Sequence, residues 1–239
     1  MSKGFLKGKW IYGLLTIPVV FAILALIYHD FAFKAGVAGT GIILLMILYS
    51  GKLRETRDVW MIILAFLFSI GGDWFLSNRH GDTNMFVAGI GLFFIAHIGY
   101  LTYGLMNGRL NKAFTVTLLT AYLLFFFLKL YPSIGDRVLL FAALVYTLIS
   151  CFSLGAAAGI KGNIVDKWVY FFGILMVLFS DTIIAFSEFT EYGDLGFLIL
   201  PTYYLAQISV TLSLMMKRMN VNHKSSVFFV LCFGLNNRP

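Results

Sequence analysis

Eight long apolar runs, separated by short polar segments, dominate the 239-residue sequence. They cover residues 10–28, 36–49, 59–77, 84–103, 114–131, 138–158, 168–187 and 196–216. A helix of about 20 apolar residues crosses the roughly 30 Å hydrocarbon core of a bilayer. Hydrophobic residues make up 60% of the chain and charged residues only 12%, whereas soluble domains carry about 25% charged residues. The sequence therefore predicts an all-α, polytopic transmembrane bundle of eight helices.

The basic residues are distributed unequally between the two sides of such a bundle. Eight spans place both termini on one side, and only four of the 18 Lys and Arg residues lie in the loops of the other side: Lys34, Arg79, Lys129 and Arg137. Because basic loops stay in the cytoplasm, both termini are predicted to be cytoplasmic. The expected organisation is a cytoplasmic N-terminus over residues 1–9, a transmembrane domain over 10–217 and a cytoplasmic tail over 218–239.

Charge and cysteine content narrow the expected partners. The net charge of +7 follows from basic loops that face an anionic leaflet, so membrane lipids are expected around the chain and no nucleic-acid partner is predicted. Cys151 and Cys232 are too few for a disulfide framework and lack metal-ligand spacing. No metal and no cofactor are predicted. An integral multi-pass position in a bacterial cytoplasmic (inner) membrane is expected, and the oligomeric state stays open.

Two aspartates, Asp73 and Asp181, lie inside predicted spans, whereas the other acidic residues lie in or beside loops. At a rise of 1.5 Å per residue both lie roughly 6 to 9 Å below the outer interface, so they could share one pocket. An Asp within a membrane helix costs about 2.5 to 3.5 kcal/mol on insertion scales, and such residues usually face a cavity or a partner. The alternative is a structural role, with hydrogen bonds to Ser69, Ser77 or Ser180.

The fourth span carries one stripe of small and aromatic residues. Its members recur at steps of three and four residues and are Phe86, Gly89, Phe93, His97 and Tyr100. The stripe is either a cavity wall or a packing seam with one hydrogen-bonded histidine. His97 is about 20 Å below the outer end of its span, well below the aspartates, which argues against a shared zinc site.

The eighth span opens with LPTYYLAQ, residues 200–207. Pro201 suits the first turn of a helix, and Tyr203, Tyr204 and Gln207 cluster on one side of it. These side chains are predicted to hydrogen-bond a polar head group, with an interfacial aromatic belt as the alternative for the tyrosines. Gln207 lies deeper in the span, where polar residues more often serve a function.

Four motifs together resemble the YhhN-like family of membrane proteins, which includes the animal lysoplasmalogenases. They are a Gly-Asp near the end of the third span, FVAGIGLFFIAHIGYL in the fourth, a Ser-Asp in the seventh and YYLAQ in the eighth, in matching order over most of the bundle. Family members often have a Pro soon after the first Asp motif, whereas SNRHG follows here. The resemblance implies a hydrolase that cleaves the vinyl ether of lysoplasmalogens to a fatty aldehyde and a glycerophospho-head-group. It also implies that Asp73 and Asp181 are catalytic, with the site shaped or lined by Gly72, Gly89, His97, Tyr204 and Gln207.

The chemistry of two carboxyl groups is compatible with that activity. Vinyl ethers hydrolyse by proton transfer to carbon, and water then captures the resulting oxocarbenium ion, so one carboxylic acid and one carboxylate suit the two steps. The expected substrate is a lysophospholipid-like amphiphile. A proton-coupled transporter is the alternative, because paired intramembrane carboxylates also serve proton relays. An intramembrane aspartyl protease would need Gly where Ile70 stands, and a purely structural role is the remaining alternative.

Overall fold

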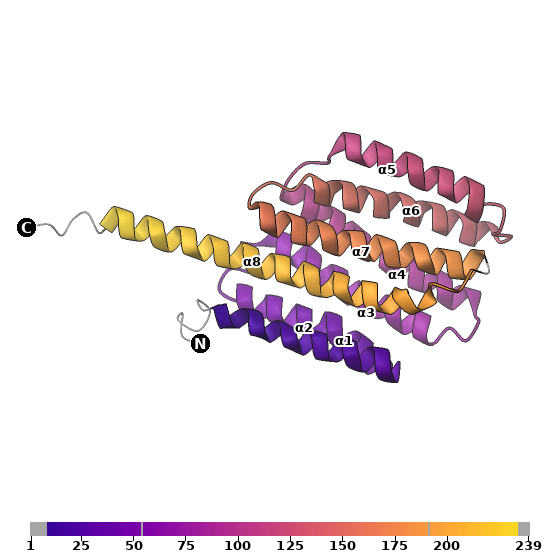
Figure 1. The fold of residues 1–239 in the computed structure, drawn as a ribbon, viewed down its shortest axis with the longest axis horizontal. Helices are drawn as coiled ribbons and strands as arrows, with labels where there is room; N and C mark the ends of the chain where they lie inside the picture. Colours follow the sequence, from indigo (N-terminus) through magenta and orange to yellow (C-terminus); the bar gives the residue numbers. More distant parts are fainter. Residues whose placement is uncertain (1–8, 54, 191, 234–239) are drawn as a thin grey trace, which may run out of the picture.

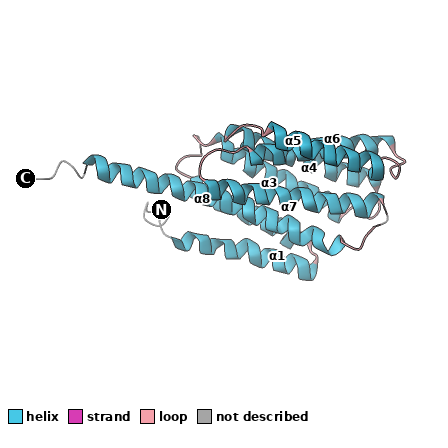
Figure 2. Ribbon diagram, turned by 45° about the horizontal axis from the view of Figure 1, so that its top comes forward, coloured by secondary structure: helices cyan, strands magenta, loops and turns pink. Residues whose placement is uncertain are grey.

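The computed structural model describes residues 9–53, 55–190 and 192–233, and within these ranges it contains helices and loops but no β-strand (Figures 1 and 2). Eight of the described helices are long and apolar enough to cross a membrane, which confirms the predicted architecture of an integral multi-pass membrane protein. The elements in chain order are η2 (Lys9–Leu15), α1 (Thr16–Tyr28), α2 (Phe31–Tyr49), α3 (Arg57–Ser77), α4 (Thr83–Met106), α5 (Lys112–Phe125), η3 (Phe126–Leu130), α6 (Arg137–Ala158), α7 (Ile164–Phe189), η4 (Gly196–Leu198) and α8 (Ile199–Phe233).

Several helices begin a few residues before the apolar runs, because a capping side chain sets their first turn. Asp30 accepts a hydrogen bond from Ala32 N, so α2 begins at Phe31 and not at residue 36. Asp82, Asp136 and Asn163 cap α4, α6 and α7 in the same way. An Asx side chain at this position satisfies an amide that has no partner within the helix. These loop residues are therefore accounted for by helix capping.

The helices form one bundle in which consecutive helices are antiparallel, with α1 and α2 at one edge and α5 and α6 at the other (Figure 1). The end of the bundle at which α1 begins and α8 leaves is called the basic end, because the lysine- and arginine-rich segments lie there (Figure 1). The opposite end, with the loops that precede α2, α4, α6 and η4, is called the distal end. Which end faces the cytoplasm stays a prediction from the charge distribution.

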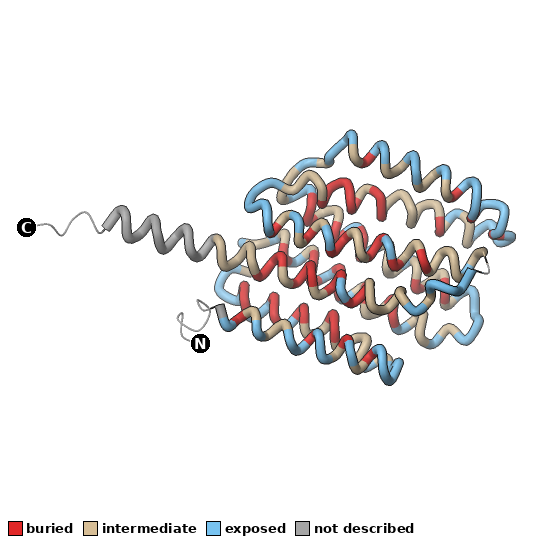
Figure 3. Tube along the Cα trace, viewed as in Figure 1, coloured by how far each residue is buried: buried red, intermediate tan, exposed pale blue. Residues whose placement is uncertain are grey.

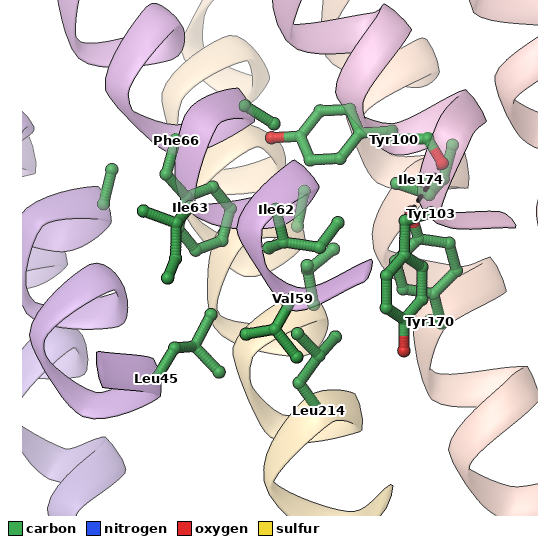
Figure 4. Packing of buried hydrophobic residues seen from close by; sticks show 14 of the residues in the cluster. Leu45, Val59, Ile62, Ile63, Phe66, Tyr100, Tyr103, Tyr170, Ile174 and Leu214 are labelled. Atoms are coloured by element: carbon green, nitrogen blue, oxygen red, sulfur yellow. Dashed lines mark hydrogen bonds between the residues drawn. The ribbon is translucent and has the colours of Figure 1, made fainter. Parts of the chain in front are cut away.

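The core lies between α2, α3, α4, α7 and α8, where buried residues concentrate (Figure 3). Two of its tyrosine hydroxyls donate to backbone carbonyls: Tyr49 to Leu214 at 2.9 Å, and Tyr170 to Tyr100 at 3.0 Å (Figure 4). Small residues allow the helices to approach closely. A Cβ added at Gly99 would lie 2.6 Å from the carbonyl oxygen of Met61, so α4 packs backbone-to-backbone on α3, as membrane helices commonly do.

The predicted domain boundary at residue 217 does not coincide with the end of a helix. α8 runs for 35 residues, from Ile199 to Phe233, which corresponds to about 52 Å at 1.5 Å per residue. The part apolar enough to span a membrane ends at Asn220. Residues 1–8 and 234–239, which belong to the predicted cytoplasmic segments, lie outside the described residues.

Candidate active site

Asp73 and Asp181 line one cavity in the distal half of the bundle, between α2, α3, α4, α7 and α8. The cavity has a volume of about 490 Å³, and Lys34, Ser77 and Tyr203 also line it. Asp73 comes from α3 and Asp181 from α7, so two helices far apart in the sequence present a carboxyl group to the same space. The sequence predicts similar depths for the two aspartates, and in the structure both line the same cavity.

A second cavity adjoins the first and is lined mainly by apolar side chains. It lies between α3, α4, α5, α6 and α7. The residues that line both cavities are Leu76, Phe93, Asp181 and Ile184. Asp181 therefore stands at the junction of a polar and an apolar compartment.

Asp181 is held by two side chains from neighbouring helices. Tyr146 of α6 donates its hydroxyl hydrogen to Asp181 Oδ2 at 2.8 Å, and His97 Nε2 of α4 lies 3.1 Å from the same oxygen. Ser150 Oγ lies 3.3 Å from His97 Nε2. His97 is buried, and its Nδ1 atom has no hydrogen-bond partner among the described residues. An imidazole that carries a proton on Nε2 can donate it to Asp181 Oδ2.

Asp73 has different surroundings from Asp181. Its carboxyl group is buried, with 8% of the residue exposed, and Tyr203 of α8 donates a hydrogen bond to Oδ2 at 3.1 Å. The Lys and Arg ion pairs within the described ranges join Arg79 with Glu188 and Lys217 with Asp58, and the contact of His97 with Asp181 is an ion pair only when the imidazole is protonated. Asp73 thus has no ion-pair partner in the described part of the chain and is held by a neutral hydroxyl.

The sequence of residues 30–214 matches the profile of the YhhN family. The chain belongs to this family. The match runs from the loop before α2 into α8, so it contains all the residues of both cavities. Searches of curated proteins and of solved structures give no match to this chain.

Residue counting places His97 well below the aspartates, whereas in the structure its Nε2 atom lies 3.1 Å from Asp181 Oδ2. Helical side chains lean toward the N-terminus of their own helix. α4 begins at the distal end and α7 at the basic end, so His97 leans toward the distal end and Asp181 leans toward His97 (Figure 1). Counting residues from helix ends ignores this convergence. Within the described ranges no three His, Cys, Asp or Glu side chains lie close enough together to hold a metal ion.

The other residues predicted to belong to the site fall into two sets. Phe86 lines the apolar cavity, Phe93 lines both cavities and Tyr203 lines the polar one. Tyr204 and Gln207 line neither cavity: Tyr204 packs against Ala22, Ala25 and Val37, and both residues are buried. The hydroxyl of Tyr204 and both amide atoms of Gln207 lack hydrogen-bond partners among the described residues.

The two predicted glycines act in helix packing and not in lining a cavity. A Cβ at Gly72 would lie 2.7 Å from the Phe93 ring, and one at Gly89 would lie 3.0 Å from Leu76. Both positions therefore belong to the contact between α3 and α4. A larger residue at Gly89 would change this contact before it reached the cavity, so the predicted wall of the fourth span includes Phe86 and Phe93 but not Gly89.

The cavity residues that were not predicted as site residues include Tyr146, Ser150 and Lys34. Tyr146 and Ser150 lie one helical turn apart in α6 and reach Asp181 and His97. A Tyr and a Ser at i and i+4 within an otherwise apolar run mark a polar patch on one helix face, and this signal could have identified them. Lys34 was counted only as a loop charge, because α2 was expected to begin at residue 36.

A third cavity, with a mostly polar lining, lies at the distal end and borders the apolar cavity. Arg79 donates two hydrogen bonds to Glu188, at 2.7 and 2.6 Å, and its guanidinium group lies 5.0 Å from the centre of the Phe86 ring. The hydrogen bonds to Glu188 raise the pKa of Arg79, which stays charged. Phe86 and Phe189 line both this third cavity and the apolar one. Their rings pack edge to face with centroids 6.1 Å apart.

Proposed function

We propose that this YhhN family member is a membrane-embedded hydrolase that cleaves the vinyl ether bond of lysoplasmalogen-like lysolipids. The products are a fatty aldehyde and a glycerophospho-head-group. The observation that supports this most strongly is the position of Asp181 between a polar cavity that contains a second aspartate and an apolar cavity. A single-chain amphiphile could place its hydrocarbon chain in the apolar cavity and its head group in the polar one. The vinyl ether bond that joins these two parts would then lie beside Asp181.

The hydrogen bonds suggest a role for each carboxyl group. Hydrogen bonds donated to a carboxylate favour its ionised form. Asp181 accepts one from Tyr146 and can accept a second from His97 Nε2, whereas Asp73 accepts one from Tyr203. We therefore assign Asp181 as the carboxylate and Asp73 as the neutral acid. The two aspartates would thus supply both catalytic forms at the same pH.

In the first step Asp73 transfers its proton to the vinyl carbon that does not carry the oxygen. The carbon–carbon double bond becomes a single bond, and the resulting oxocarbenium ion is stabilised by the Asp181 carboxylate. Water adds to the cationic carbon and gives a proton to Asp181, which leaves a hemiacetal. Asp73 then accepts the hydroxyl proton of the hemiacetal while Asp181 protonates the departing glycerol oxygen. The carbon–oxygen bond breaks, the aldehyde forms, and both carboxyl groups return to their starting states.

Purified protein in detergent tests this proposal. Aldehyde release is measured from a lysoplasmalogen and from the matched alkyl-ether lysolipid, in which the double bond is saturated and cannot be protonated. We expect aldehyde from the vinyl ether alone. A proton-coupled transporter, the alternative that two intramembrane carboxylates also suit, would give no aldehyde and would move its solute only in vesicles with a proton gradient. The bacterial cytoplasmic membrane, with the distal end facing outward, is part of the proposal.

A further inference from the structure

Lys34 is a cation in the cavity that holds both aspartates. It lies in the first turn of α2, which begins at Phe31, and its side chain is partly buried. No other Lys or Arg is among the described residues that line this cavity. Its ammonium group donates a hydrogen bond to Ser77 Oγ at 3.1 Å. An ammonium carries three hydrogens, so Lys34 has donors left for a further acceptor.

The charge of Lys34 is not used in an ion pair. Within the described ranges Lys and Arg form two ion pairs, Arg79 with Glu188 and Lys217 with Asp58; Lys34 takes part in neither, although two carboxyl groups line the same cavity. A lysine that served only to balance these aspartates would be expected within contact distance of one of them. Lys34 instead contacts a neutral hydroxyl at the side of the cavity formed by α2 and α3, and its charge acts on Asp73 through space without a direct contact. This arrangement leaves a positive charge and a hydroxyl available to an anion.

The anion must lie on the head-group side of the proposed substrate. Asp181 and the three apolar residues shared with the second cavity mark the side where the hydrocarbon chain would enter. Lys34 and Ser77 line only the polar cavity. Three glycerol carbons separate the vinyl ether oxygen from the phosphate of a lysolipid, so a phosphate would lie beyond the aspartates when the vinyl ether lies between them. A carboxylate at Asp181 would repel that phosphate unless a cation lay close to it.

From these contacts we infer that Lys34, assisted by Ser77, binds the phosphodiester of the substrate, and that the protein discriminates between lysolipids with and without a phosphate. The inference rests on the proposed function. Lysine is a common point-charge partner of phosphate, and the serine hydroxyl can accept from Lys34 while it donates to a phosphate oxygen. Head-group recognition then begins with the charge that all lysophospholipids share, whatever alcohol the phosphate carries.

The test uses binding, so that it does not depend on turnover. The two ligands are a 1-alkyl-ether lysophospholipid and the 1-alkylglycerol of the same chain length, which lacks the phosphate. The proteins are the wild type, Lys34→Gln, Lys34→Arg and the control Lys129→Gln. The control removes a charge from the distal end without touching the cavity. Melting temperature and gel filtration in detergent verify that each variant is folded.

We expect Lys34→Gln to weaken binding of the lysophospholipid by about 10- to 100-fold, as for the loss of a hydrogen bond to a charged group, and to leave binding of the alkylglycerol unchanged. Lys34→Arg should retain most of the affinity, and Lys129→Gln all of it. Equal losses for both ligands, or no loss for either, would overturn the inference. The proposed function fails separately: a wild type that binds the phospholipid through Lys34 but releases no aldehyde from lysoplasmalogen is not the proposed hydrolase.

Discussion

The carboxyl groups at the two ends of the bundle are stabilised in different ways. At the basic end, Asp58 accepts hydrogen bonds from Lys217 at 2.6 Å and from Asn107 at 3.1 Å. Both oxygens of Asp166 accept from Asn220. Asp58 and Asp166 also lie in the first turns of α3 and α7, where the helix dipole favours negative charge. These carboxyl groups thus have local partners that favour the charged form.

Neither aspartate of the distal half lies in the first turn of a helix, where the dipole would favour its charge. Asp73 and Asp181 lie well inside α3 and α7, their hydrogen bonds come from tyrosine and histidine side chains, and both face a cavity. Such placements inside a membrane protein are costly and usually functional. The comparison teaches that location in the bundle separates structural carboxyl groups from candidate catalytic ones, even though all four come from the same two helices.

Asparagine substitution should give the largest difference between the two ends. Asp73→Asn and Asp181→Asn keep the size of the side chain but can neither deliver nor accept the catalytic proton, so we expect aldehyde release to fall by about 10²- to 10⁴-fold. Asp58→Asn should keep near-normal turnover per folded molecule. Initial rates with purified protein measure all three. Near-normal rates for either distal variant would remove that aspartate from the mechanism.

The free energy of unfolding should show the reverse pattern, with the larger effect at the basic end of the bundle. Asp58→Ala leaves Lys217 without its carboxylate, and both side chains are partly exposed, at 16% and 32%. We therefore expect a loss of about 1 to 3 kcal/mol, below the range for a fully buried pair. Asp73→Asn should not lower stability, because an amide is easier to bury than a charge. Unfolding of the purified variants in detergent provides the comparison, and a larger loss for Asp73→Asn than for Asp58→Ala would contradict it.

A smaller effect should come from the hydroxyl that holds Asp181. Tyr146→Phe removes one hydrogen bond and leaves the ring, so we expect roughly a tenfold loss in turnover, corresponding to about 1.4 kcal/mol. Tyr122→Phe is the matched control, because Tyr122 lines the same apolar cavity but pairs with Thr182 at 2.9 Å. Its turnover should stay close to that of the wild type. Similar losses for both variants would mean that Tyr146 acts only through packing.

Hydropathy was sufficient to predict the bundle, because every span has to be apolar and helical to lie in a bilayer. Predicting where each helix begins requires a second signal, the capping residue. Asp30, Asp82, Asp136 and Asn163 were assigned to loops, yet each caps the helix that follows it and moves its first residue outward. Caps can be recognised in a sequence, so this part of the difference was avoidable.

The candidate site was predictable only in part. Asp73 and Asp181 stood out because a charge inside a span is costly, and the structure brings them to one cavity. The contact between His97 and Asp181 depends on side-chain lean and helix packing, which residue counting along single helices does not contain. The same limit applies to Gly89, whose stripe was identified from the sequence while the helix that it faces became known only from the packing.

The claim that Asp73 and Asp181 work as one unit is tested most directly by the double variant Asp73→Asn/Asp181→Asn. Residues that act in the same step are strongly non-additive. We predict that aldehyde release from lysoplasmalogen by the double variant is close to that of the slower single variant. The contradictory result is a rate reduced by the product of the two single effects, because aspartates that act independently would lose their contributions separately.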